Sequence, residues 1–323
     1  MIVIGIESTA HTLGVSIVKN DDILSNEKEL YKTTKGGMIP AKVADHHIEV
    51  CDEVLKRALK KSKIKITDVD LISFSSSPGI GHTLRIGAVF SRILSLKLKI
   101  PVIGVNHCIA HLEIGRKFSK FKDPILLYAS GANTQVIGFE SGKYRVFGET
   151  LDNGVGNFLD GFAREMGLGF PGGPKIEELA KKGKYVELPY SVKGMDVSFG
   201  GLLTKLKNIK HKHKIEDLCF SIQETVFAML TEVTERALAH TGKNELVLGG
   251  GVGCNKRLQE MLQKMCDERG AKFFAPKNEY LVDNAAMIAH LGYIKYNKEK
   301  EYSLKETKID PYLRTDEVEI NYR

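Results

Sequence analysis

The sequence predicts an α/β protein organised around parallel strands, and three observations support this fold class. Short β-branched apolar runs alternate with longer stretches of helical periodicity. A predicted strand at 71–74 is followed by a loop, a predicted helix at 84–98 and a second strand at 102–105, which is the order of a right-handed crossover between parallel strands. A second half beginning at Pro124 opens like the first, with a strand, a turn of small residues and a return strand. We therefore expect two related lobes that face one cleft.

The first lobe, predicted to span residues 1–110, is expected to begin with a hairpin. Apolar runs at 2–7 and 13–18 flank a turn of small residues, Ser8-Thr9-Ala10-His11-Thr12. Hydroxyl and backbone N–H groups in such a turn can hold an anion, although many hydroxyl-rich turns hold nothing. A third strand at 23–29 and an amphipathic helix at 41–61 follow, before the crossover described above.

The second lobe, predicted to span 111–323 with a C-terminal tail, is expected to repeat this plan. Strands are predicted at 125–129, 135–140, 144–149 and 246–248. Helices are predicted at 155–166, 174–182, 215–241, 253–268 and 284–296. The strand at 246–248 continues into a glycine run, 249–253, whose backbone N–H groups could approach a phosphate. The run matches neither a P-loop nor the GxGxxG pattern, so by itself it is weak support for a nucleotide.

The composition excludes a membrane protein and a disulfide-stabilised secreted protein. The chain has 323 residues, of which 42% are hydrophobic and 27% charged. No apolar run approaches the roughly 18 residues that cross a bilayer, and the N-terminus has no basic leader segment. The five cysteines are odd in number and form no CxxC, which indicates a reducing cytoplasm.

The net charge of +7 is concentrated in lysine runs at 60–63, 181–184 and 205–214. A lysine run is more often a solvated face than a binding site. Such runs would nevertheless attract a polyanion, and salt would weaken that attraction.

The most informative stretch is Asn106-His107-Cys108-Ile109-Ala110-His111. Asn106 follows a predicted buried strand and is a good N-cap, so a helix is expected to begin at His107. Two histidines four residues apart lie on one helix face and can bind one metal ion, although such pairs also arise by chance. Zinc proteases of this pattern need Glu after the first His as general base, and Cys108 stands there. The pair therefore indicates a metal site but not a protease.

Six motifs, in order and spacing, resemble those of one family. They are Gly5-Ile6-Glu7-Ser8-Thr9-Ala10-His11-Thr12, Asn106-His107-Cys108-Ile109-Ala110-His111, Tyr128-Ala129-Ser130-Gly131-Ala132-Asn133-Thr134-Gln135, Phe170-Pro171-Gly172-Gly173-Pro174, Gly250-Gly251-Val252 with Asn255, and Asp283-Asn284. The chain resembles the universal tRNA threonylcarbamoyladenosine family, called TsaD in bacteria. It is similar to the archaeal and eukaryotic branch, the catalytic subunit of the KEOPS complex. The resemblance covers residues 2 to about 318.

The resemblance implies an actin/Hsp70/sugar-kinase-like fold with two lobes around a central nucleotide cleft. It implies a metal-dependent acyltransferase that moves threonylcarbamoyl from threonylcarbamoyl-AMP to N6 of the adenosine beside the anticodon, in tRNAs that read codons beginning with A. The implied partners are tRNA, a small kinase-like ATPase subunit and a small dimerising subunit, and no membrane. Because no kinase-like extension follows residue 323, the ATPase is expected to be a separate chain in the cytoplasm.

The resemblance also implies roles for individual residues. The metal ligands would be His107, His111, Tyr128 and Asp283. Contacts to the substrate or nucleotide would come from Thr9, Tyr128, Ala129, Ser130, Gly131, Ala132, Asp160, Gly173, Glu177 and Asn255. The cofactors would be an adenine nucleotide and one divalent metal ion, iron in preference to zinc, although imidazole and oxygen ligands suit either. Ala132 departs from the glycine usual in the family and adds a methyl group where backbone would approach phosphate.

Three other functions stay open. A catalytically silent paralogue could serve only as a scaffold of the same complex, but such a protein would not need four metal ligands in register. A metalloprotease would need the base that Cys108 replaces. A sugar or carboxylate kinase of the same fold would not predict the two metal-binding histidines.

Overall fold

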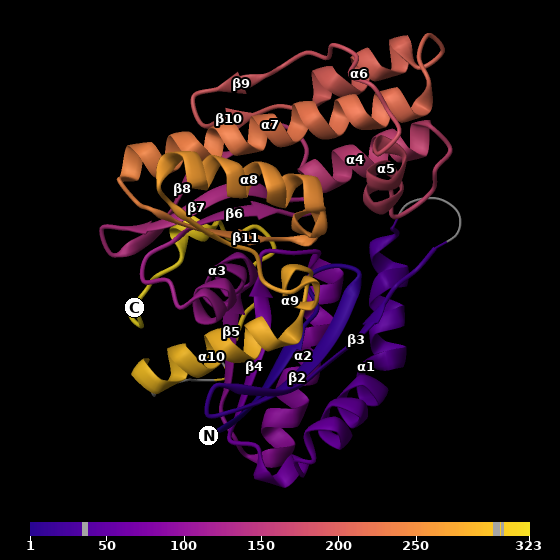
Figure 1. Cartoon of the computed structure of the whole chain (residues 1–323). Helices are drawn as coiled ribbons and strands as arrows, with labels where there is room; N and C mark the ends of the chain where they lie inside the picture. Colours follow the sequence, from indigo (N-terminus) through magenta and orange to yellow (C-terminus); the bar gives the residue numbers. More distant parts are fainter. Residues whose placement is uncertain (34–37, 300–303, 305–306) are drawn as a thin grey trace. The chain divides into compact units, whose positions relative to one another are not determined.

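The computed structural model describes residues 1–33, 38–299, 304 and 307–323, and the chain divides into two compact units (Figure 1). Unit 1 comprises Met1–Ile114, Gly142–Tyr144 and Asp283–Arg323, and unit 2 comprises Gly115–Ser141 and Arg145–Val282. The units differ from the ranges 1–110 and 111–323 mainly at the C-terminal end. The segment from Asp283 onward belongs to unit 1 because helix α10 (Ala285–Glu299) packs on the sheet of that unit.

Unit 1 contains a five-stranded sheet of order β3-β2-β1-β4-β5. The first three strands form an antiparallel meander, and β4 and β5 join it parallel to β1. The strands are β1 (Ile2–Glu7), β2 (Thr12–Lys19), β3 (Asp22–Leu30), β4 (Leu71–Ser77) and β5 (Val102–Asn106). The carboxyl ends of β1, β4 and β5 therefore meet at one edge of the sheet, which is where parallel sheets of this kind place their ligands.

Helices cover both faces of this sheet. Successive residues of a strand point to opposite faces, and in β1 both sets before Glu7 are small or apolar. Ile4 and Ile6 point toward the core shared with α1 (Pro40–Ser62) and α2 (Gly81–Leu98). Gly5 points the other way, toward the backbone of α10 at Ala285. Strand β1 is therefore apolar at every position from Ile2 to Ile6 instead of alternating between apolar and polar residues, as expected for a strand buried on both faces.

Unit 2 repeats the strand order of unit 1 with a sheet β8-β7-β6-β11-β12. Strands β6 and β7 are antiparallel, and β11 and β12 join parallel to β6. The strands are β6 (Ile125–Ala129), β7 (Thr134–Glu140), β8 (Lys143–Glu149), β11 (Glu245–Gly249) and β12 (Lys272–Phe274). In both units, three consecutive strands are thus followed by two parallel ones, which confirms the predicted relation between the two halves.

The remaining elements of unit 2 lie between its strands or after them in the sequence. They are α4 (Val155–Glu165), α5 (Gly173–Ala180), β9 (Val192–Lys193), β10 (Asp196–Val197), α6 (Gly200–Ile209), α7 (Ile215–Thr241), α8 (Lys256–Arg269) and α9 (Asn278–Leu281). The long helix α7 buries Leu218, Ile222, Val226 and Leu230 in the core beside the sheet, as their helical spacing predicts. Among the described residues, no helix combines the length and apolar character that a bilayer span requires.

Candidate metal centre and nucleotide-binding turns

Helix α3 (His107–Ser119) begins at the residue that the sequence predicts. Strand β5 ends at Asn106, whose side-chain oxygen accepts a hydrogen bond from the N–H of Ile109 at 3.1 Å and caps the helix. His107 and His111 then lie on successive turns with ring centroids 4.8 Å apart. Both imidazoles are buried, so the helix presents them inside unit 1 rather than to solvent.

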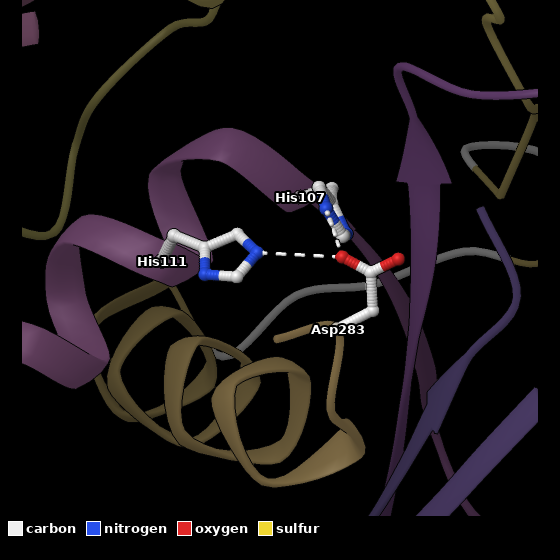
Figure 2. Close-up of side chains that lie close together, drawn as sticks. All are labelled: His107, His111 and Asp283. Atoms are coloured by element: carbon white, nitrogen blue, oxygen red, sulfur yellow. Dashed lines mark ion pairs between the residues drawn. The ribbon is translucent and has the colours of Figure 1, made fainter. Parts of the chain in front are cut away.

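A second capped helix brings a carboxylate to the same place. The side chain of Asn284 accepts the N–H of Met287 at 3.0 Å and starts α10, which leaves Asp283 just ahead of the helix. The Asp283 Oδ1 atom lies 3.4 Å from His107 Nε2 and 3.7 Å from His111 Nε2 (Figure 2). One ligand atom from each of the three residues lies within 4.8 Å of the others.

These distances fit ligands of one metal ion better than direct hydrogen bonds. Two ligands with bonds of about 2.1 Å and a tetrahedral angle lie about 3.4 Å apart. The 3.7 Å separation between His111 Nε2 and Asp283 Oδ1 is too long for a hydrogen bond. Two imidazole nitrogens and a carboxylate oxygen form a donor set that zinc and iron both accept. The three residues therefore could hold a divalent metal ion, and we call them the candidate metal centre.

The pKa values of His111 and Asp283 are shifted in the directions that favour metal binding. Burial lowers the pKa of His111, so its imidazole is neutral at neutral pH. Burial also raises the pKa of Asp283, but the imidazoles of His107 and His111 outweigh it and hold that pKa well below the usual carboxyl range. Burial raises the pKa of the Cys108 thiol, so the residue between the two histidines is neither a thiolate ligand nor a carboxylate base.

Glu7, which was not among the predicted site residues, contacts this centre. It ends β1, is fully buried, and its Oε2 atom lies 3.0 Å from His107 Nδ1. Its other oxygen, Oε1, accepts the N–H and the hydroxyl of Thr9 at 2.7 and 2.5 Å. An acidic residue at the end of an otherwise apolar strand is a signal that could have identified it.

The turn between β1 and β2 is held by hydrogen bonds from several elements. The carbonyl of Thr9 accepts the N–H of Ile80 at 2.8 Å and the hydroxyl of Thr83 at 3.2 Å. His47 Nε2 lies 3.0 Å from the carbonyl oxygen of Ala10 and must donate to it. Burial, with the neighbouring His46 and His11, lowers the pKa of His47 to about 4, so this buried donor is neutral. The hydroxyl of Thr9 donates to Glu7 Oε1 and lies 3.4 Å from His107 Nδ1.

The corresponding turn of unit 2 follows β6. Tyr128 and Ala129 are buried at the end of that strand, and the Ser130 hydroxyl donates to the carbonyl of Asn133 at 3.0 Å. Gly250, with φ of +91°, approaches so closely that a Cβ there would lie 2.3 Å from the carbonyl oxygen of Ala129. Ala132 does not share such a positive φ, so its methyl group adds no backbone strain to the turn.

The other predicted nucleotide contacts also lie in unit 2, where they order neighbouring backbone. Asp160 on α4 accepts the N–H of Gly172 at 2.7 Å, just before Gly173 opens α5. Glu177 on α5 accepts the N–H of Lys256 at 3.0 Å, and Asn255, the preceding residue, caps α8 by accepting the N–H of Arg257 at 2.9 Å. Glu177 and Asn255 are therefore neighbours, although 78 positions of sequence numbering separate them.

The structure thus groups the predicted residues by unit. His107, His111, Asp283 and Thr9 belong to unit 1, whereas Tyr128 belongs to unit 2. The remaining predicted nucleotide residues, from Ala129 to Asn255, also belong to unit 2. The assignment of Tyr128 as a fourth ligand stays a prediction.

Comparisons with known sequences identify close relatives. A family model described as "TsaD: tRNA N6-adenosine threonylcarbamoyltransferase" matches residues 22–290. A Thermococcus sibiricus protein named tRNA N6-adenosine threonylcarbamoyltransferase is 53% identical, and the match covers 100% of each chain. A Methanocaldococcus jannaschii protein is 52% identical over 100% of this chain, which spans 60% of that relative. Its name is "Probable bifunctional tRNA threonylcarbamoyladenosine biosynthesis protein".

Solved structures with little sequence similarity share the fold. HypF of T. kodakarensis superposes with a TM-score of 0.64 at 12% identity, covering 95% of this chain and 49% of HypF. Component A of (R)-2-hydroxyglutaryl-CoA dehydratase from Acidaminococcus fermentans gives a TM-score of 0.57 at 15% identity, covering 92% of this chain and 100% of component A. These similarities confirm the predicted actin/Hsp70/sugar-kinase-like fold class and carry no information on activity.

Proposed function

Because the chain belongs to the TsaD family, we propose that it is a tRNA N6-adenosine threonylcarbamoyltransferase. The observation that carries this proposal is the 53% identity to a relative of that name over the whole of both chains. The transferred group would come from threonylcarbamoyl-AMP. The acceptor would be N6 of the adenosine beside the anticodon, in tRNAs that read codons beginning with A.

In this reaction a bond forms between N6 and the carbamoyl carbon, the bond from that carbon to the phosphate oxygen breaks, and AMP and one proton leave. An exocyclic amine is a weak nucleophile, so the protein must act by positioning both substrates and by stabilising charge on the carbonyl oxygen. A divalent ion, when bound, would supply Lewis acidity toward the acyl group or its threonine carboxylate. His107, His111 and Asp283 would hold it, with Tyr128 as a further ligand, and we propose iron in preference to zinc.

The adenylate would be bound by residues of unit 2. The turn from Ser130 to Ala132, with Tyr128 and Ala129 before it, would approach the phosphate and acyl portions of threonylcarbamoyl-AMP. Asp160, Gly173, Glu177 and Asn255 would surround the nucleoside, where carboxylates suit ribose hydroxyl groups. Thr9, on the turn of unit 1, would face the phosphate. Asp160 and Glu177 already accept hydrogen bonds from neighbouring backbone, so their side chains are held in place before a ligand binds.

Two of the lysine runs of unit 2 approach each other at their ends, and we propose that tRNA binds there. The N–H of Lys184 donates to Asp217 at 2.7 Å, and Asp217 lies three residues after Lys214. The runs 181–184 and 205–214 therefore adjoin, and we call them the basic face. Lys212 and Lys214 are exposed, whereas Lys210 pairs with Glu165 at 2.6 Å. The target base lies in a single-stranded loop, so the basic face would contact phosphates while the base is read elsewhere.

Removing the two exposed lysines should weaken tRNA binding in a salt-dependent way. For Lys212→Ala/Lys214→Ala, the slope of log affinity against log salt should become shallower by about two, because each phosphate contact contributes roughly 0.9. Filter binding of labelled tRNA from 50 to 300 mM salt, spanning roughly the range over which such contacts weaken, measures this slope. The matched control is Lys210→Ala, since Glu165 already offsets that charge. An unchanged slope in the double variant would show that tRNA binds another surface.

We also propose that the chain works beside separate subunits in the cytoplasm. The partners would be a small kinase-like ATPase and a small dimerising subunit of a KEOPS-type complex. Relatives named bifunctional, of which this chain spans about 60%, support a second activity that acts together with the transferase. The free cysteines of the described chain suit a reducing compartment.

The direct test is a transfer assay with the full chain. The chain and its proposed partner subunits are incubated with unmodified tRNA and threonylcarbamoyl-AMP, and the tRNA is then digested and its nucleosides are weighed. We expect threonylcarbamoyladenosine in amounts that depend on the chain. Unmodified tRNA in the presence of every partner would instead favour the scaffold function.

A further inference from the structure

Glu7 makes different hydrogen bonds with its two carboxyl oxygens. Oε2 lies 3.0 Å from Nδ1 of His107, whereas Oε1 accepts both the N–H and the hydroxyl of Thr9. No part of the Glu7 side chain is exposed to solvent. Both oxygens of this buried side chain therefore have hydrogen-bond partners, as burial of a carboxyl group requires.

The contact to His107 decides which ring nitrogen can bind a metal ion. An acceptor at Nδ1 requires the proton on that nitrogen, which leaves the lone pair on Nε2. Nε2 is the atom that lies 3.4 Å from Asp283 Oδ1 in the candidate metal centre. A carboxylate behind a ligating imidazole also fixes the plane of the ring and increases its basicity.

The contact to Thr9 connects the same carboxylate to the turn between β1 and β2. The turn residue is 4% exposed, and its backbone carbonyl is held by Ile80 and Thr83. One side chain at the end of β1 therefore orders both a ligand of the candidate metal centre and the turn proposed to face the phosphate.

We propose that Glu7 is a positioning residue of the candidate metal centre, which holds His107 in the tautomer that binds metal through Nε2 and holds the Thr9 turn in place. This inference rests on the proposed function only in that the centre binds a divalent ion. Glu7 is not among the three residues whose ligand atoms gather in the candidate metal centre. Its loss should therefore weaken metal binding without removing a ligand.

The substitution Glu7→Gln separates positioning from simple space filling. The amide has the shape of the carboxylate but only one acceptor oxygen. If that oxygen accepts from His107, the NH₂ group faces the N–H of Thr9, and if the amide turns, the NH₂ group faces the Nδ1–H of His107. Either orientation loses one contact. Thr9→Val is the matched control, because it removes the hydroxyl that donates to Oε1 and lies 3.4 Å from His107 Nδ1, but it keeps the Glu7 carboxylate 3.0 Å from that nitrogen.

The first measurement is the affinity of the chelator-treated full chain for Co²⁺, followed by its visible absorption. We expect one Co²⁺ per wild-type chain, affinity weakened about 10- to 100-fold in Glu7→Gln, and affinity within about threefold of wild type in Thr9→Val. Equal affinity in wild type and a folded Glu7→Gln would overturn the positioning role and leave the metal centre intact. If the wild-type chain itself bound no Co²⁺, the metal centre of the proposed function would fail, and this inference with it.

A second measurement does not depend on whether Glu7→Gln folds. Nitrogen-15 NMR of the metal-free wild-type chain reports the tautomer of each histidine, and comparison with His107→Gln assigns the His107 signals. We expect Nδ1 to be protonated and Nε2 to be unprotonated. The opposite tautomer would overturn the proposal.

Discussion

The His111→Ala variant is expected to lose tRNA modification almost completely. Removing one imidazole leaves the candidate metal centre with His107 and Asp283 in unit 1, so the ion is held weakly and its Lewis acidity is lost. Loss of one such stabilising group typically lowers the rate about 100-fold or more. The rate of threonylcarbamoyladenosine formation and the metal content of the purified chain should fall together.

Cys108→Ala is the matched control on the same helix. Cys108 is as buried as the two histidines, but its thiol is not part of the candidate metal centre. We expect this variant to keep its metal ion and to work within about threefold of the wild-type rate, since only a small buried group is lost. Wild-type rates in a metal-free His111→Ala chain would contradict a metal-dependent mechanism and would favour a catalytic site elsewhere.

Gly5→Ala should strongly destabilise unit 1. A Cβ at this position would lie 2.2 Å from the carbonyl oxygen of Ala285 and 2.6 Å from the backbone nitrogen of Ala289. Both atoms belong to the backbone of α10, which cannot move aside like a flexible side chain. We expect the free energy of unfolding of unit 1 to fall by about 3 kcal/mol, the upper end of the usual cost of overpacking.

Thermal unfolding followed by circular dichroism measures this loss, with an expected decrease of roughly 6–12 °C if the unit melts cooperatively. Because α10 begins two residues after Asp283, displacement of the helix should also weaken metal binding. Gly81→Ala is the control, since its Cβ would meet only Pro311, at 3.4 Å. A wild-type melting temperature for Gly5→Ala would show that α10 packs less tightly on β1 than these distances indicate.

Local sequence was sufficient for the elements that carry the strongest patterns. The N-cap Asn106 and the apolar strand before it predict where α3 starts, and the spacing of His107 and His111 predicts a shared face. The apolar positions of α7 likewise predict a buried helix. Helix α6 and strand β12 were not predicted, because α6 is short and opens with Gly200-Gly201, and β12 has only three residues.

The sequence by itself determined the α/β class, the repeated hairpin that opens each half and the helix that presents the two histidines, because these depend on periodicity and capping over a few neighbouring residues. The two-lobed fold class came from the family resemblance of its motifs. Only the tertiary structure decided that the segment from Asp283 joins unit 1 and that Glu7 supports His107 from behind. Such pairings join residues about one hundred or more positions apart, and they form because buried carboxylates require partners that no local pattern specifies.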